Sequence, residues 1–379
     1  MTFRKQVSVK KPMLKSGFLE SAFPWLFAAI LAGYPLVSVI PVLFGLESRR
    51  ISVPFRAAVL GLSLAVVLAA VSKRRFRFRQ ALVPLFVFWA LYSSRILFDT
   101  VLRPVELGRP PSEYLLFAFG VTFVPMLAFL ARYEDSTLSA AYRRVLAVAS
   151  VACAAALYLN RLGFSATERL FAMRGGRMAT ETLNPVSLGH LGVSVALLSL
   201  LLYFRARGVP WGWRKAVPIG LFIVGILTIG VAGSRAPIIA FLAVFLVVVL
   251  SEFDWRRGLK ILLVSAVVLM AIYRGFSYLE ENLGFLAVSR IQKTFSTLPE
   301  VSDPARFRLF SDAWSQFLEN PLFGSGLEER HSLFYPHNVV LESFMATGIV
   351  GGAMFCLVIG LGLAAVFRRI RGPYPHKWI

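Results

Sequence analysis

Long apolar runs separated by short polar segments make up most of this chain. Ten of these runs reach or approach the roughly 20 residues that cross a bilayer as a helix. We predict transmembrane helices at about 23–45, 54–71, 81–98, 114–132, 141–160, 184–204, 216–232, 235–252, 258–275 and 339–367. The pattern therefore predicts an all-α fold, a polytopic membrane helix bundle of about ten transmembrane helices.

The longest segment between two apolar runs, residues 276–336, has a helical pattern of its own. After Pro304, large apolar side chains recur at helical spacing at Phe307, Phe310, Trp314, Phe317 and Leu318. Proline favours the first position of a helix, and Asp303 in front of it suits the N-cap. We predict an amphipathic helix that lies over the outer ends of the bundle.

The charge of the chain agrees with a membrane protein. Its 379 residues are 57% hydrophobic and carry a formal net charge of +21. Such a charge is typical of nucleic-acid-binding proteins when the basic residues form one soluble face. Here they lie in short runs between apolar segments, so we expect membrane lipids around the helices and no nucleic acid.

The basic runs also predict an orientation, because Lys and Arg accumulate in cytoplasmic loops. With the N-terminus inside, Lys293 is the single lysine of nine that lies outside. Both termini are then cytoplasmic. The predicted parts are a basic N-terminus (1–20), transmembrane helices 1–9 (21–275), a large outer loop with the amphipathic helix (276–336), transmembrane helix 10 (337–367) and a cytoplasmic tail (368–379).

Three predicted helices start on the outer side, each with a polar signature. The starts are Asn184-Pro185, Ser234-Arg235-Ala236-Pro237 and Pro336-His337-Asn338. Helix N-termini carry about half a positive charge and attract anions such as phosphate. Arg177 precedes the first start and Arg235 lies in the second, and arginine suits bidentate contact with phosphate. We predict that these groups converge on an anion such as a lipid-linked diphosphate.

Each candidate residue also has a structural interpretation. His337 is a candidate general base, because a helix N-terminus favours a neutral imidazole; alternatively it is an interfacial hydrogen-bonding residue. Arg235 equally suits an anchor in a tight turn. Arg177 is one of several arginines in its loop, Arg174 among them. His190 either lines the same cavity or satisfies a neighbouring backbone group.

Two charged residues lie inside predicted helices. We expect Arg95 to pair with Asp99 one turn later, although a charge within the membrane is also a hint of function. Glu342, one turn into the last helix, either orients nearby arginines or pairs with them structurally, and we favour the structural role. Cys153 and Cys356 lie in apolar runs without metal-ligand spacing, so we expect two buried thiols and no disulfide.

Four ordered motifs occur within residues 170–355. His337-Asn338 precedes, after nine residues, Gly348-Ile349-Val350-Gly351. The other three are a P-L-x-G-x-G turn at 321–326 with Arg306 fifteen residues before it, a G-S-R-A turn at 233–236, and Arg177 seven residues before an N-P pair. Together with the H-N-x9-G-x-x-G pattern, these motifs resemble the O-antigen ligase and polymerase superfamily of bacterial membrane glycosyltransferases.

The resemblance implies a fold and a reaction. Relatives are lipid-phosphosugar-dependent glycosyltransferases of the GT-C type with a helical periplasmic loop. They transfer a glycan from undecaprenyl diphosphate, with inversion at the anomeric carbon, on the periplasmic side of the bacterial inner membrane. The acceptor is lipid A core in ligases and another lipid-linked glycan in O-antigen, capsule and exopolysaccharide polymerases. The motifs do not separate the two, and we favour the ligase.

The resemblance also implies residue roles. His337 takes the proton of the acceptor hydroxyl, while Arg177 and Arg235 bind the diphosphate and stabilise its growing charge. The residues expected to bind substrate are Arg174, His190, Arg306 and Asn338. Arg306 alternatively only holds the amphipathic helix to its loop. Family ligases are thought to need no metal, and no D-x-D motif or acidic cluster occurs in the outer loops, so we expect no metal and no cofactor.

A different class of function is a non-enzymatic transporter of lipid-linked glycans. Transporters often show an internal repeat and charged or broken helices near the middle of the membrane. No repeat is visible in this chain, and apart from Arg95 and His190 the centres of the predicted helices are apolar. We therefore favour the enzyme.

Overall fold

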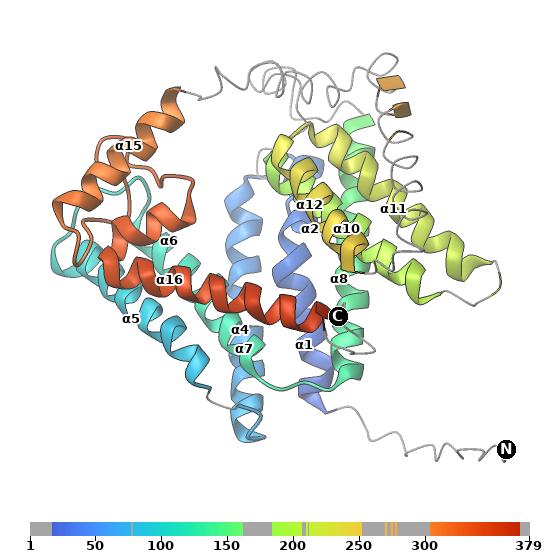
Figure 1. Ribbon diagram of the computed structural model, residues 1–379, viewed down its shortest axis with the longest axis horizontal. Coiled ribbons are helices and arrows are strands. Elements are labelled where there is room, and N and C mark those ends of the chain that lie inside the picture. The colour runs from blue at the N-terminus through green and yellow to red at the C-terminus, as the bar shows by residue number, and fades with distance from the viewer. Residues whose placement is uncertain are drawn as a thin grey trace.

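The structure, a computed structural model, describes residues 17–76, 79–161, 184–206, 210, 212–251, 270, 274–275, 277–278 and 304–371. Within these residues the regular structure is helical, and β pairing is limited to one isolated bridge between Glu329 and Phe334. Figure 1 shows the arrangement of the helices. Their bounds, in chain order, are α1 Phe18–Ala28, η1 Ala29–Gly33, α2 Tyr34–Val37, α3 Val39–Phe44, α4 Ser48–Ser72, η2 Gln80–Leu82, α5 Val83–Leu97, η3 Phe98–Leu102, α6 Pro111–Leu115, η4 Leu116–Phe123, α7 Val124–Leu130, α8 Asp135–Arg161, α10 Pro185–Arg205, α11 Trp213–Ala232, α12 Arg235–Ser251, α15 Pro304–Glu319 and α16 Val339–Arg371.

Eight helical segments of the described chain are long and apolar enough to cross a membrane. They are Phe18–Phe44, Ser48–Ser72, Gln80–Leu102, Pro111–Leu130, Asp135–Leu159, Pro185–Phe204, Trp213–Ala232 and Val339–Arg369. Each overlaps a predicted span. The span predicted at 235–252 is the shorter helix α12, and the span predicted at 258–275 lies largely outside the described residues. The prediction of an all-α polytopic membrane bundle is confirmed.

Helix α8 is the support on which the N-terminal helices pack. It contacts α1, α2, α10 and α11. Its buried face carries small side chains, among them Ala149, Ala152 and Cys153, and small residues let helix backbones approach closely. Ala32 of η1 and Leu191 of α10 pack into the same cluster. The first span and α10 are therefore both held against α8.

Helices α5 and α16 form a second packing unit, seen on the left of Figure 1 together with α15. The ring of Phe88 in α5 lies 5.0 Å from that of Phe355 in α16, and Trp89 lies 5.1 Å from Phe123 in η4. Such aromatic pairs add roughly 0.5–1.5 kcal/mol to the area they bury. The first pair holds α16 against α5, and the second holds η4 against α5.

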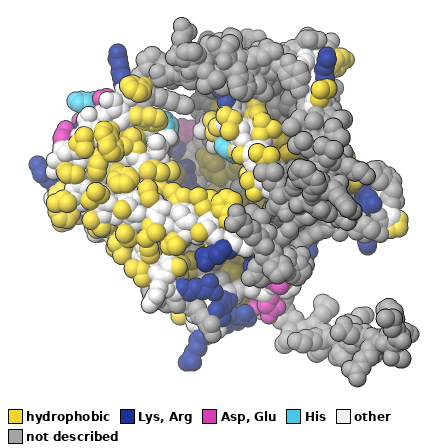
Figure 2. Space-filling view, viewed as in Figure 1, with side chains coloured by type: hydrophobic (Ala, Val, Ile, Leu, Met, Phe, Trp, Pro, Cys, Tyr) yellow, Lys and Arg dark blue, Asp and Glu magenta, His cyan; other side chains and the backbone are white. Residues whose placement is uncertain are grey.

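The second half of α16 is exposed. Leu357, Leu363 and Phe367 lie on the surface, and hydrophobic side chains cover the face formed by α5 and α16 in Figure 2. An apolar face of this kind suits contact with lipid chains. Cys356 is exposed on the same helix, whereas Cys153 is buried. The prediction of two buried thiols is therefore wrong for Cys356, because the helices that the structure describes pack on only part of the circumference of α16.

The helix predicted after Pro304 is present as α15, which packs on the start of α16. Its buried face is built from Ala313, Gln316 and Phe317. Phe307 and Trp314 instead point away from the helices that the structure describes and are largely exposed. The apolar pattern thus predicted the helix correctly, while the side that packs includes a glutamine whose amide is hydrogen-bonded.

Candidate functional site

The motif turn at 321–326 follows α15 directly and requires a glycine. Gly324 donates its N–H to the carbonyl of Asn320 at 2.9 Å and has a φ of 72°. A Cβ atom built on it would lie 2.5 Å from the carbonyl oxygen of Met345. Only glycine adopts this conformation without strain and leaves room for α16. The turn therefore packs backbone to backbone against α16.

The turn packs against α16 at a position where the helix is interrupted. Gly348 has a φ of 70°, and a Cβ atom there would lie 2.1 Å from the carbonyl oxygen of Leu322. Beside it, Ile349 donates its N–H to Pro321 at 2.7 Å, and Ser325 donates to Met345 at 2.8 Å. The helix predicted at 339–367 is thus interrupted, because backbone groups of α16 bond to the turn instead of to their own helix.

Arg95 of α5 holds the turn and the helix break together. Its Nη2 donates to the carbonyls of Phe323 at 2.9 Å and Gly324 at 2.8 Å, and its Nε donates to the carbonyl of Ala346 at 2.9 Å. Its Nη1 pairs with Asp99 at 3.1 Å, which confirms the predicted pair. Arginine offers five donors in a fixed fork, and here four separate acceptors use them.

Asp99 completes this network from η3, the helical turn that directly follows α5. Its carboxylate is 2% exposed, and its Oδ2 accepts the N–H of Leu327 at 3.1 Å. A buried carboxylate is costly without partners, and Arg95 and Leu327 supply them. The Arg95 side chain, which the sequence places inside a predicted membrane helix, and the Asp99 side chain therefore hold the motif turn in place. No local sequence pattern predicts this role.

The loop after the turn contains two buried carboxylates. Glu328 accepts hydrogen bonds from the N–H of Gly108, at 2.7 Å, and from the hydroxyl of Tyr114. Glu329 accepts the N–H groups of His331 at 2.8 Å and Ser332 at 2.7 Å. Burial raises the pKa of Glu329, but these hydrogen bonds outweigh it, so the pKa lies below its ordinary value. Both carboxylates fix the loop that leads to His337.

His337 is exposed and directly precedes α16 in the left-handed backbone region, with a φ of 54°. Its ring stands edge-on to Tyr335, with centroids 4.4 Å apart, and lies 5.1 Å from the ring of Phe334. A positive φ is uncommon for a residue other than glycine and often marks a functional position. These aromatic neighbours therefore help to position the imidazole of an exposed residue.

Asn338 is the N-cap of α16. Its Oδ1 accepts the N–H groups of Val340 at 3.1 Å and Leu341 at 3.2 Å, and its carbonyl accepts the N–H of Glu342 at 2.8 Å. This is the usual role of asparagine at a helix start. The structure thus gives Asn338 a capping role, and its contact with substrate stays a prediction.

Glu342 points toward α5. Its carboxylate accepts a hydrogen bond from the hydroxyl of Tyr92 at 3.4 Å. Within the described residues it forms no ion pair with an arginine, so the expected arginine partner is replaced by a tyrosine. This contact joins the first turn of α16 to α5 and agrees with the structural role that we favoured.

Arg235 is the first residue of α12. Gly233, with a φ of 56°, ends α11, and the buried Ser234 leads directly into α12. The Arg235 side chain is half-buried and, within the described part of the chain, has no ion pair or hydrogen bond. An arginine without a partner at a helix N-terminus is a suitable anion-binding group.

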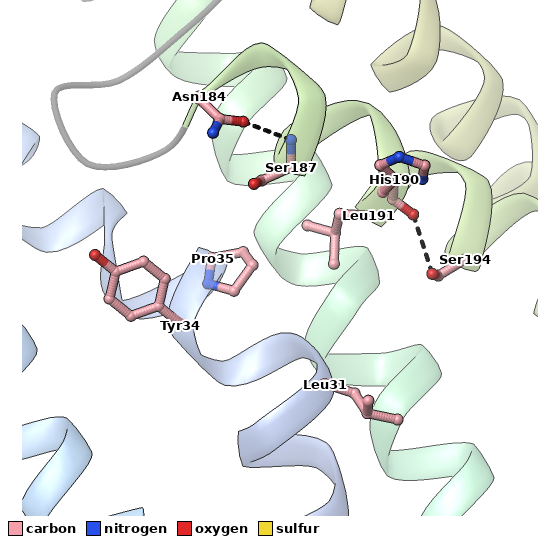
Figure 3. Close-up of a pocket in the computed structure, with 8 residues that line it drawn as sticks. All are labelled: Leu31, Tyr34, Pro35, Asn184, Ser187, His190, Leu191 and Ser194. Carbon is pink, nitrogen blue, oxygen red and sulfur yellow. Dashed lines mark hydrogen bonds between the residues drawn. The ribbon is translucent and has the colours of Figure 1, made fainter. Parts of the chain in front are cut away.

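His190 lies on α10, on the rim of a cleft of about 390 Å³ that separates α10 from the first span (Figure 3). The residues lining it are Leu31, Tyr34, Pro35, Asn184, Ser187, His190, Leu191 and Ser194. Asn184 caps α10 by accepting the N–H of Ser187 at 2.8 Å. His190 therefore lines a cleft, which is one of the two possibilities that the sequence left open.

The α10 start also touches the α12 start. A Cβ atom on Gly189 would lie 2.5 Å from Cγ of Pro237. Gly189, the residue before His190, is therefore in direct contact with α12, the helix that begins at Arg235. Figure 2 shows a hollow in the surface between the part formed by α15 and α16 and the part formed by α10 and α12.

Three predicted residues have no described side chain. Arg174 and Arg177 lie outside the described residues. Arg306 lies in α15, where the structure describes its backbone but not its side chain. The structure therefore places His337 and Asn338 at the start of α16, the helix whose break packs on the motif turn, and Arg235 and His190 in the first turns of neighbouring helices. Within the described ranges no group of three His, Cys, Asp or Glu side chains is arranged to hold a metal ion.

Comparison with protein families identifies a relationship for part of the chain. Residues 220–356, a little over a third of the sequence, match the family model described as O-antigen ligase. This region includes Arg235, the motif turn, Arg306 and His337, and it excludes Arg174, Arg177 and His190. No curated protein and no solved structure matches the chain. Residues 220–356 of this multi-pass membrane protein are thus similar to the O-antigen ligase family.

Proposed function

We propose that the protein is an inverting, metal-independent glycosyltransferase that transfers a glycan from undecaprenyl diphosphate to a hydroxyl of lipid A core. It resides in the bacterial inner membrane with both termini in the cytoplasm and its site facing the periplasm. The observation that carries the proposal is His337: within the family region, an exposed imidazole stands in front of a capped helix, on a loop held by buried hydrogen bonds.

His337 is the general base of this mechanism. The acceptor oxygen attacks the anomeric carbon on the face opposite the diphosphate, and the new carbon–oxygen bond forms as the bond to the diphosphate breaks. The proton of the acceptor hydroxyl passes to the imidazole, and the electron pair of the broken bond leaves with undecaprenyl diphosphate. A positioned base of this kind contributes roughly 10²–10⁴-fold to the rate.

Arg235 is the diphosphate-binding group. Its guanidinium has no carboxylate partner within the described residues and lies at the start of α12, where the helix dipole adds positive potential. Negative charge grows on the diphosphate as it leaves, and a fixed cation stabilises that charge. Arg177 is proposed to act with Arg235, and Arg174, Arg306, His190 and Asn338 to contact the substrates.

A polymerase that joins lipid-linked repeats would use the same base and the same donor. It differs only in the acceptor, which is the sugar hydroxyl of a second lipid-linked glycan. We place the ligase first and retain the O-antigen, capsule or exopolysaccharide polymerase as the alternative.

A reconstituted assay separates these functions. The purified protein in lipid nanodiscs receives a short undecaprenyl-diphosphate-linked glycan, with or without lipid A core, and products are identified by gel and mass spectrometry. His337→Ala and Arg235→Ala are compared with His331→Ala and Arg308→Ala, which remove the same kinds of side chain at exposed positions.

Transfer that requires lipid A core and fails in the first two variants establishes the ligase. Longer lipid-linked products without that acceptor establish the polymerase. No product with either acceptor, combined with movement of the lipid-linked glycan across a bilayer, would replace the enzyme by a transporter.

A further inference from the structure

The cleft between the first span and α10 has a mixed lining that helix packing does not explain. The first span and α10 both pack on α8, and the cleft lies between them (Figure 3). Ser187 and Leu191 of α10 point toward Pro35 across this space. Apolar side chains would let the two helices close on each other, whereas the cleft is edged by hydroxyl, amide and imidazole groups.

Several of these polar groups have no partner among the described residues. Ser194 donates its hydroxyl to the carbonyl of His190 at 3.0 Å, and Asn184 uses its Oδ1 for the helix cap. Within the described residues, the hydroxyl of Ser187, the imidazole of His190 and the hydroxyl of Tyr34 have no hydrogen-bond partner. Polar groups in the first turns of a membrane-spanning helix are costly against lipid chains. The cleft therefore suits an occupant that offers hydrogen bonds.

The charge of the lining residues also bears on the kind of occupant. Arg56, which is not a lining residue, lies over the Tyr34 ring, with its Cζ 5.7 Å from the ring centroid. None of the eight lining residues is Asp, Glu, Lys or Arg, so the lining itself supplies no counter-ion for a phosphate or an ammonium group. It offers neutral donors and acceptors together with the ring of Tyr34. This combination fits an uncharged, hydroxyl-rich group whose flat face of C–H bonds packs on an aromatic ring, which is the chemistry of a sugar.

The position of the cleft connects it to the proposed diphosphate site. Gly189, between the cleft residues Ser187 and His190, packs on Pro237, which lies two residues after Arg235. An α-helix rises only about 1.5 Å per residue. A group held at Arg235 and a group held at His190 therefore belong to neighbouring helix ends.

We propose that this cleft binds an uncharged sugar residue of the lipid-linked donor, through Ser187, His190 and the Tyr34 ring. The inference rests on the proposed function, because it takes the donor from there. The cleft would then select the sugar, while Arg235 selects the diphosphate regardless of the sugar attached to it.

The test is direct binding to the full-length protein in lipid nanodiscs, without any acceptor. The two probes are undecaprenyl-diphosphate-linked N-acetylglucosamine and undecaprenyl diphosphate, both radiolabelled. The variants are Ser187→Val and His190→Phe, which remove hydrogen-bonding groups and keep bulk in the cleft. Ser72→Val is the matched control, because it makes the same change at an exposed helix position where the hydroxyl bonds only to its own helix. Thermal unfolding verifies that each variant is folded.

We expect wild type to bind the sugar-bearing probe more tightly than undecaprenyl diphosphate. Each cleft variant should weaken binding of the sugar-bearing probe about tenfold, the effect of losing about one hydrogen bond, and should leave binding of undecaprenyl diphosphate unchanged. Ser72→Val should change neither. Equal wild-type affinity for both probes, unchanged binding in the variants, or equal loss for both probes would each overturn the proposal.

The outcome is separable from that of the transfer assay. Binding that depends on the sugar, without transfer to any acceptor, would keep the cleft and remove the enzyme. Transfer that requires His337 while the cleft variants bind normally would keep the enzyme and remove the cleft.

Discussion

Arg95 donates a hydrogen bond from Nη2 to the carbonyl oxygen of Gly324 at 2.8 Å, across 229 positions of sequence. The same guanidinium reaches α16 through the carbonyl of Ala346 and is balanced by Asp99. One side chain thus joins α5, the motif turn and α16. Because His337 lies on the loop between that turn and α16, the position of the proposed base depends on a cation that does not touch it.

Replacing Arg95 by Ala should destabilise the protein by roughly 3–5 kcal/mol, because Asp99 becomes a buried carboxylate without its cation. Three carbonyls also lose their donor. Thermal unfolding in detergent measures the effect. The control is Arg330→Ala, which removes an ion pair with Glu319 in which both side chains are 53% exposed; this should cost about 1 kcal/mol or less. Equal effects of the two substitutions would show that the Arg95 network contributes no more than a surface ion pair.

Gly348→Ala should destabilise the protein and reduce activity, because the new Cβ meets the carbonyl of Leu322 and the φ of 70° is strained for alanine. Gly360→Ala in the same helix is the matched control, since nothing lies within 4 Å of a Cβ there. It should leave stability unchanged or raise it by about 0.5–1 kcal/mol. If Gly348→Ala has a melting temperature equal to that of wild type, the break in α16 is not required.

Asn338→Asp should preserve stability, because a carboxylate caps a helix as well as an amide does and is favoured by the dipole. It should reduce transfer, because it removes the amide nitrogen of a residue that is proposed to contact the substrates. Asn338→Ala should lose about 1 kcal/mol of stability. Unfolding and transfer are measured on the same samples. Transfer equal to that of wild type in a stable Asn338→Asp protein would limit Asn338 to its capping role.

Glu329 should make stability fall in acid. Its pKa is lower in the folded protein than the ordinary value of 4.5, so its contribution is complete above that value and is lost as the pH falls through the lower, folded value. The melting temperature of wild type should therefore drop more steeply below about pH 4.5 than that of Glu329→Gln, which has no charge to titrate. Parallel curves for the two proteins would contradict the assignment.

The membrane spans were predictable from sequence because an apolar run long enough to cross a bilayer is a local property. The span predicted at 184–204 is α10, Pro185–Arg205, and the one predicted at 216–232 lies within α11, Trp213–Ala232. The helix after Pro304 was predictable for the same reason. The Arg95 and Asp99 pair followed from their spacing of four residues on one helix.

The long-range contacts were not predictable. Gly348 lies in an otherwise helical pattern, and its positive φ results from the meeting of its backbone with a turn about 25 residues earlier. The groups that Arg95 binds on the turn and on α16 are backbone carbonyls, which every residue has, so the sequence does not show which residues it contacts. Asn338 illustrates the reverse, since an asparagine before an apolar run is itself a local signal for a helix N-cap.

The central claim is that His337 removes the proton from the acceptor, and single-turnover transfer by His337→Ala tests it most directly. With saturating donor and acceptor, the rate constant should fall on the order of 10²-fold or more, while His331→Ala, on the same loop, should stay within about threefold of wild type. A His337→Ala rate constant close to that of wild type, in a folded protein that still binds donor, would contradict the assignment of the base.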